Sequence, residues 1–126
     1  MRLVYIAGKL TTGDREHNIR VAADVADMVV VAGRERWAPV VMHTMTNGVK
    51  YGDDAYWLKA AREVLQRCDA VLFLPDFRES PGAWTEHRDA VRMRMPMCEL
   101  SSTTDMKAVY EALKELDHLY EERNAH

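Results

Sequence analysis

Short apolar runs alternate with longer amphipathic segments along the chain. Residues 2–7 (RLVYIA) are apolar and rich in β-branched side chains, and Gly8 ends the run, which is typical of a buried strand that leads into a glycine loop. Asp14 can cap the helix that follows, where apolar side chains recur at helical spacing from Ile19 until Gly33 ends the segment. The chain therefore begins with a strand–loop–helix unit.

A second unit of the same kind follows. Residues 37–42 (WAPVVM) predict a second strand, whose register Pro39 leaves open, and the polar residues 43–54 predict a loop. Asp53 or Asp54 caps the next predicted helix. The apolar side of that helix is formed by Trp57, Ala60, Ala61, Val64 and Leu65.

The alternation continues in the carboxyl-terminal half. Residues 70–74 (AVLFL) give the strongest strand signal of the chain and are expected to form the central strand. Ser80 and Pro81 mark a helix start, with serine as the cap and proline at the first helical position. A brief strand is predicted at residues 97–100. A last helix places Met106, Val109, Leu113, Leu116 and Tyr120 at helical spacing.

Uniformly apolar strands that alternate with helices predict an α/β fold. We expect one domain of 126 residues, a three-layer sandwich whose four- to five-stranded parallel sheet has helices on both faces, with a frayed tail after residue 120. Ligands of such sheets bind at the carboxyl ends of the strands. Residues 8–14, 43–54 and 75–82 are therefore the candidate binding loops.

Composition and charge exclude several classes of function. The 17 basic and 20 acidic residues are spread along the chain and give a net charge of -3, which argues against a nucleic-acid polymer as partner. Neither a signal peptide nor an apolar stretch of membrane-spanning length is recognisable. Cys68 and Cys98 lack metal-ligand or CxxC spacing. We therefore expect a cytoplasmic protein that needs no membrane, metal or cofactor.

Candidate chemistry lies in residues 76–87 (DFRESPGAWTEH). Main-chain amides at a helix start and the Ser80 hydroxyl can bind an anion, and Gly82 has no Cβ to keep a phosphate or sugar away. Helical side chains lean toward the amino terminus, so Glu86 would point back over the same pocket. The alternative is an ordinary helix cap with a solvated glutamate.

Three motifs in register suggest a family. YIAG at residues 5–8, CDA at 68–70 and Ser80-x-Gly82-Ala83-x-x-Glu86 resemble the nucleoside 2-deoxyribosyltransferase-like superfamily, including small uncharacterised members and nucleoside 5'-monophosphate N-glycosidases, over residues 3 to about 97. The resemblance implies a Rossmann-like fold and cleavage of an N-glycosidic bond through a covalent glycosyl-enzyme. Glu86 matches the nucleophile. Ser80 resembles the branch that binds a 5'-phosphate, so a nucleoside monophosphate is the expected ligand.

The same resemblance suggests roles for other residues. It implies that Tyr5 orients the catalytic carboxylate, although a buried core tyrosine is an equal account. Gly8 is expected to let the backbone approach the ligand. His43 resembles a histidine of small relatives that would touch the base or sugar, or else it is an exposed loop residue. Trp57 can stack on a base or fill the core.

The chain departs from the family at the expected general acid. Relatives have an aspartate where this sequence has Ala61. Asp54, the neighbouring Asp53 or Asp76 can substitute as the acid that protonates the leaving base, although a helix cap or a turn explains each of them as well. Asp69 begins its strand at the end away from the ligand and is interpreted as structural.

Three hypotheses follow for the function. The first is an enzyme that hydrolyses or transfers the glycosidic bond of a (deoxy)nucleoside 5'-monophosphate. The second is a nucleotide-binding module that has lost the acid. The third is an oligomeric interaction domain that uses the eight methionines and the amphipathic last helix. The family resemblance also implies at least a homodimer.

Overall fold

A computed structural model of the chain describes residues 1–45 and 49–125. Its strands are β1 (Arg2–Ala7), β2 (Trp37–Val40), β3 (Ala70–Phe73) and β4 (Met97–Glu99). Its helices are α1 (Arg15–Gly33), α2 (Met42–Met45), α3 (Asp54–Gln66), α4 (Pro81–Arg92) and α5 (Met106–Asn124), with a 3-10 turn η1 (Phe77–Glu79) between β3 and α4.

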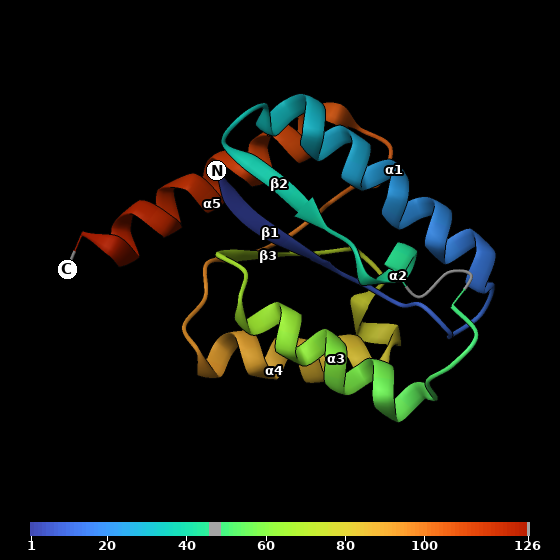
Figure 1. Cartoon of the computed structure of the whole chain (residues 1–126). Helices are drawn as coiled ribbons and strands as arrows, with labels where there is room; N and C mark the ends of the chain where they lie inside the picture. Colours follow the sequence, from blue (N-terminus) through green and yellow to red (C-terminus); the bar gives the residue numbers. More distant parts are fainter. Residues whose placement is uncertain (46–48, 126) are drawn as a thin grey trace.

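Within the described ranges, the sheet has four parallel strands in the order β2-β1-β3-β4. Helices cover both of its faces, so the predicted three-layer, Rossmann-like α/β fold is confirmed (Figure 1). The chain runs outward from β1 to β2 and then crosses back to β3 on the other side of β1. The strand order therefore reverses between β1 and β3, the point of such sheets where ligands bind.

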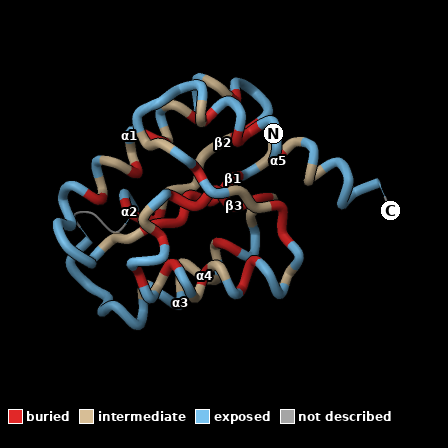
Figure 2. The backbone as a smooth tube through the Cα atoms, turned by 180° about the vertical axis from the view of Figure 1, so that it is seen from behind, coloured by how far each residue is buried: buried red, intermediate tan, exposed pale blue. Residues whose placement is uncertain are grey.

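The period-2 alternation of the strands divides the core into two layers. Val4 and Ile6 of β1 face the layer of α1 and α5, whereas Tyr5 and Ala7 face the layer of α3 and α4. Figure 2 shows the buried backbone concentrated in the sheet and on the inner sides of these helices. Tyr5 therefore belongs to the core half that α3 and α4 close.

The predicted helix starts are confirmed. Asp14, Asp53 and Ser80 precede α1, α3 and α4, and each side chain accepts a hydrogen bond from the main-chain N–H three residues further on, at 3.1, 2.8 and 3.2 Å. Such caps satisfy donors that the first helical turn leaves without partners. The three local signals thus fix where the helices begin.

The second strand is shorter than predicted. β2 ends at Val40, and Met42 begins the one-turn helix α2, so His43 lies in a helix and not in the predicted loop. Pro39 is accommodated because β2 is an edge strand, where a missing N–H costs no pairing within the sheet. Residues 46–48 of the predicted loop lie outside the described residues.

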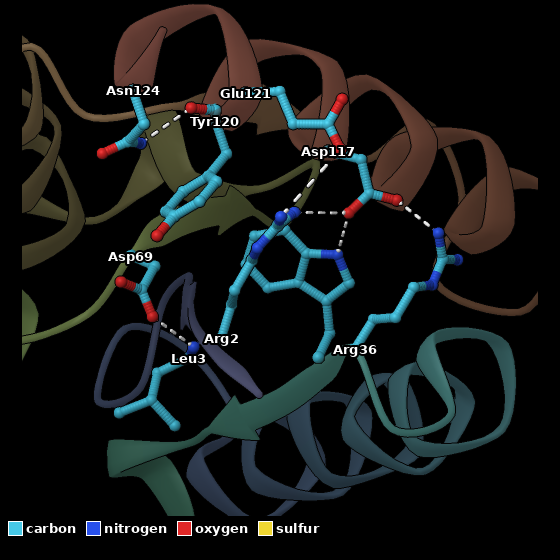
Figure 3. A network of polar contacts seen from close by, with 9 residues as sticks. Arg2, Leu3, Arg36, Asp69, Asp117, Tyr120, Glu121 and Asn124 are labelled. Carbon is cyan, nitrogen blue, oxygen red and sulfur yellow. Dashed lines mark hydrogen bonds and ion pairs between the residues drawn. The ribbon is translucent and has the colours of Figure 1, made fainter.

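The last helix continues to Asn124, beyond the point where fraying was predicted. Asp117 accepts hydrogen bonds from Arg2, Arg36 and the indole of Trp37, at 3.1, 2.7 and 2.8 Å (Figure 3). The Arg2 guanidinium also lies 4.1 Å from the centre of the Tyr120 ring. These contacts join α5 to the starts of β1 and β2 just before its polar end, which has no apolar periodicity of its own.

Candidate functional site

A cavity of about 340 Å³ opens at the carboxyl ends of β1 and β3, within the usual size range of small-molecule sites. All three loops expected to bind the ligand contribute to its wall. The lining residues are Tyr5, Gly8, Leu10, Thr11, Thr12, Met42, His43, Asp54, Trp57, Leu58, Ala61, Ser80, Pro81, Gly82, Ala83 and Glu86. Of the ten residues given candidate roles from the sequence, eight are among them, and Asp53 and Asp76 are not.

Glu86 is the buried carboxyl group of this cavity. Its side chain, on the second turn of α4, accepts a hydrogen bond from the Tyr5 hydroxyl, and the residue is only 6% exposed. Burial raises the pKa of Glu86 to about 7; the Tyr5 hydrogen bond opposes this shift, and the charge of Asp89 adds to it. A carboxyl group with this pKa exchanges its proton near neutral pH, as general acids and bases require.

Tyr5 joins the central sheet to this carboxyl group. Its pKa is raised well above the ordinary value, chiefly by burial and then by the neighbouring Glu86. The phenol therefore stays protonated and donates to the carboxylate. Geometry thus supports the orienting contact that the resemblance implies and fixes the Glu86 side chain toward β1.

The start of α4 forms the wall next to Glu86. Ser80 is buried, and its hydroxyl caps the Ala83 N–H. Helix geometry leaves the Gly82 N–H without an intrahelical partner. A Cβ on Gly82 would lie 3.7 Å from the Leu58 Cδ1 and 3.8 Å from the Ser80 Oγ, which are ordinary contacts. Packing alone therefore does not require glycine at this position, so the space in front of this backbone remains open to a ligand.

His43 lines the cavity from α2 and is only 4% exposed. The alternative interpretation of His43 as an exposed loop residue is therefore wrong. Its Nε2 lies 3.1 Å from the Lys9 carbonyl oxygen. Burial lowers the pKa of His43, although hydrogen bonding to the Lys9 and Gly8 carbonyls acts in the opposite direction. The neutral ring is therefore favoured at neutral pH, with an Nε2–H that donates to the carbonyl.

Close packing against Leu74 favours glycine at position 8, which the sequence alone did not suggest. A Cβ at this residue would come within 2.7 Å of the Leu74 Cδ1, so the end of β1 could not approach the end of β3 with a larger side chain. Gly8 does line the cavity, as expected. The close approach that it permits is first of all to Leu74.

The three aspartates proposed as substitutes for the missing acid have different surroundings. Asp54 lines the cavity, and Asp53 caps α3. Asp76 lies outside the cavity wall, and its Oδ2 is 4.0 Å from the Nζ of Lys9. The chain turns into η1 directly after Asp76. The role of Asp76 as a substitute acid stays a prediction. Ala61, where the resemblance would place an aspartate, also lines the cavity.

The loop after β1 adds residues that sequence reasoning missed. Leu10, Thr11 and Thr12 line the cavity. The buried Asn18 of α1 donates hydrogen bonds to the carbonyls of Leu10 and Thr12, at 3.0 and 2.9 Å. A buried asparagine on the apolar face of a helix was the signal that this loop is held in a fixed conformation.

Asp69 has the structural role expected of it. Its Oδ2 accepts a hydrogen bond from the Leu3 N–H at 2.7 Å, and this contact lies at the start of β3, away from the cavity. Cys68 and Cys98 are free and half-buried. Over residues 1–45 and 49–125, no group of three His, Cys, Asp or Glu side chains is arranged to hold a metal ion. The helices of the same ranges include none with the length and apolarity to cross a membrane.

These features define a Rossmann-like α/β protein with a cavity at the point where the strand order reverses. Residues 2–99 match the family described as "Domain of unknown function (DUF4406)", and the chain belongs to that family. No curated protein matches the sequence. The matched residues include the four strands and every residue of the cavity wall, and they end before α5.

Proposed function

We propose that this protein cleaves the N-glycosidic bond of a (deoxy)nucleoside 5'-monophosphate, with Glu86 as the nucleophile. One observation carries the proposal: a buried carboxyl group, hydrogen-bonded to a tyrosine, shares a cavity with the capped start of α4. The motifs that resemble the nucleoside 2-deoxyribosyltransferase-like superfamily supply the same glutamate, tyrosine and serine.

In the proposed reaction, a carboxylate oxygen of Glu86 attacks the anomeric carbon of the sugar. A carbon–oxygen ester bond forms as the carbon–nitrogen bond breaks, and the base leaves with the bonding electrons and takes up a proton. Water or a second base then attacks the same carbon and releases the carboxylate. A pKa of about 7 leaves part of Glu86 ionised at neutral pH, and the Tyr5 hydrogen bond directs the reacting oxygen.

The start of α4 is proposed to bind the 5'-phosphate. The Ser80 hydroxyl and the main-chain N–H of Gly82 are polar groups next to Glu86 in the cavity wall, and the positive end of the helix dipole favours an anion. Trp57 is proposed to stack on the base, and His43 to contact the base or sugar. The combination favours a monophosphate over a free nucleoside.

Asp54 is the proposed proton donor to the leaving base. Of the aspartates considered as replacements for the family's acid, it is the one that lines the cavity. If Asp54 is the acid, Asp54→Asn should slow release of bases that need protonation, with little loss for a nucleotide whose leaving group is already a good one. Asp53→Asn is the matched control, because it alters only the helix cap.

The decisive test is a panel of deoxynucleoside and ribonucleoside monophosphates, with free base followed by chromatography and a second base added to detect transfer. Wild type should release base, and Glu86→Gln should be inactive. Glu79→Gln is the matched control, because Glu79 is exposed and pairs with Lys9 outside the cavity. Retention of wild-type activity by Glu86→Gln would overturn the assignment.

A second candidate function is a nucleotide-binding module without turnover, which Ala61 in the cavity wall favours. Such a module would bind monophosphates in calorimetry and release no base. Ala61→Asp would then restore a carboxyl group at the family's position and is expected to produce base release. Base release by wild type would exclude this candidate.

The resemblance also leads us to propose a cytoplasmic homodimer. Met45, Val49, Tyr51 and Tyr56 expose large apolar groups between α2 and the first turn of α3, next to segments that line the cavity. A second copy that covers these four side chains would also shield the cavity from water. Sedimentation should then give a dimer that Tyr51→Glu and Tyr56→Glu weaken; a wild-type monomer would refute it.

A further inference from the structure

An ion pair between the partly exposed Arg62 and the buried Asp89 joins α3 to α4. The Asp89 carboxylate, whose side chain is 3% exposed, accepts two hydrogen bonds from Arg62, from Nε at 2.7 Å and from Nη2 at 3.1 Å. Arg92 adds a third hydrogen bond at 3.1 Å. Bidentate arginine–carboxylate pairs are directional as well as strong, so this pair fixes the packing of α3 against α4.

Both members of the pair are next to residues of the cavity wall. Arg62 follows Ala61 on α3, and Asp89 is three residues after Glu86 on α4. Side chains three residues apart lie on the same side of a helix. The buried carboxylate of Asp89 is therefore a neighbour of the buried carboxyl group of Glu86.

We propose that Asp89, held by Arg62, is a positioning residue that determines the orientation and the protonation state of the Glu86 carboxyl group. This inference rests on the proposed function, because it assigns Asp89 to the group that would attack the sugar. Asp89 touches no substrate in this account. It acts by holding α3 against α4 and by keeping a fixed negative charge one turn from Glu86.

The groups around Glu86 shift its pKa in opposite directions. Hydrogen bonding to Arg62 is the largest influence on Asp89; it lowers the pKa of Asp89, with help from Arg92 and Arg88, and keeps this carboxylate ionised. The charge of Asp89 in turn raises the pKa of Glu86, in the same direction as burial. Tyr5 from β1 acts in the opposite direction, and His43 from α2 and Asp54 from α3 are the other titratable groups of the cavity wall. Asp89 and Tyr5 thus shift the pKa of Glu86 in opposite directions.

Two substitutions with opposite expected signs test this inference. Asp89→Asn keeps an acceptor for Arg62 and removes the charge, so the pKa of Glu86 should fall by roughly half a unit or more. Arg62→Gln removes the main compensating charge, while Arg92 and Arg88 still favour the ionised form of Asp89, so the pKa of Glu86 should rise. Arg62 is 41% exposed at its side chain, which makes this variant the one expected to fold even if Asp89→Asn does not.

The pKa of Glu86 is read directly from the carbon chemical shift of its carboxyl group in the intact, isotope-labelled protein, with assignment by Glu86→Gln. Glu63→Gln is the matched control, because it removes an acidic charge from the exposed side of α3, where Glu63 pairs with Arg67. The Arg62 and Asp89 variants could instead lower the melting temperature and leave the Glu86 titration unchanged. The pair would then only stabilise the contact between α3 and α4, and the inference would be overturned. Activity separates the two hypotheses: absence of base release by wild type contradicts the proposed function, whereas the Glu86 titration still decides the role of Asp89.

Discussion

The Tyr5 hydroxyl on β1 donates a hydrogen bond to the carboxyl group of Glu86 on α4, and thereby links the central sheet to the helix that begins at the cavity. The two residues are 81 positions apart in the chain. Their contact is possible because Tyr5 faces the α3 and α4 layer, and because β1 lies beside β3, which leads into α4.

Removal of this hydrogen bond should raise the pKa of Glu86 above about 7, because the bond favours the ionised form. Hydrogen bonds to charged groups contribute about 1.5–3 kcal/mol, which corresponds to about one pH unit or more. In Tyr5→Phe, the acidic limb of the base-release profile should therefore move to higher pH, and the rate at pH 7 should fall roughly fivefold. Tyr51→Phe, at a residue that is 84% exposed, should leave the profile unchanged. A Tyr5→Phe profile identical to wild type would contradict this role.

The raised pKa of Glu86 also predicts how stability depends on pH. The folded protein binds this proton up to about pH 7, whereas the unfolded chain releases it near 4.5, so Glu86 favours folding at low pH and loses that contribution as pH rises through 7. The loss is on the order of 3 kcal/mol. Gln mimics the protonated side chain and still accepts from Tyr5. Urea unfolding should therefore find Glu86→Gln close to wild type at pH 4.5 and more stable at pH 8; parallel curves would contradict the burial of this carboxyl group.

Gly82 and Gly8 provide a comparison between a ligand-facing glycine and a packing glycine. Gly82→Ala should fold normally, because the added Cβ meets Leu58 only at 3.7 Å and alanine favours a helix by about 1 kcal/mol. If the phosphate binds there, the same methyl group should weaken monophosphate binding roughly tenfold or more in calorimetry.

Gly8→Ala should behave in the opposite way. Its Cβ would come within 2.7 Å of Leu74, and such overpacking costs about 1–3 kcal/mol of the free energy of unfolding. Unfolding curves of the two variants decide the question. Equal stability of both would show that the strand ends can move apart, and unchanged binding by Gly82→Ala would place the phosphate elsewhere.

Most of the fold could be predicted because its signals are local. The apolar run at residues 70–74 contains β3 (Ala70–Phe73), and Asp14, Asp53 and Ser80 are caps that determine helix starts within one turn. α2 was missed because a four-residue helix carries no periodicity. Its conformation is held by neighbours, such as the Lys9 carbonyl next to the His43 ring.

The cavity could be predicted from topology, and its details could not. Parallel strands bring their carboxyl ends to one edge, which is why loops distant in sequence were expected to meet there. Asp76 looked equivalent to Asp54 in the sequence, yet Asp54 lines the cavity, whereas Asp76 lies outside its wall with Oδ2 4.0 Å from the Nζ of Lys9. The pair of Arg62 and Asp89 was missed because its partners are 27 residues apart on two helices, and no local pattern encodes that contact.

The attachment of the last helix can be tested at Asp117. This carboxylate accepts from Arg2, Arg36 and the buried Trp37 indole (Figure 3). Asp117→Ala would leave the Trp37 N–H buried without an acceptor, which costs about 1–3 kcal/mol, and should expose the amides of α5 near its end to faster hydrogen exchange. Asp117→Asn keeps an acceptor and should lose less. Arg36→Gln should cost below about 1 kcal/mol, because the Arg36 side chain is half exposed and surface ion pairs contribute little. Equal losses in Asp117→Ala and Arg36→Gln would mean that the indole hydrogen bond does not hold α5 to the sheet.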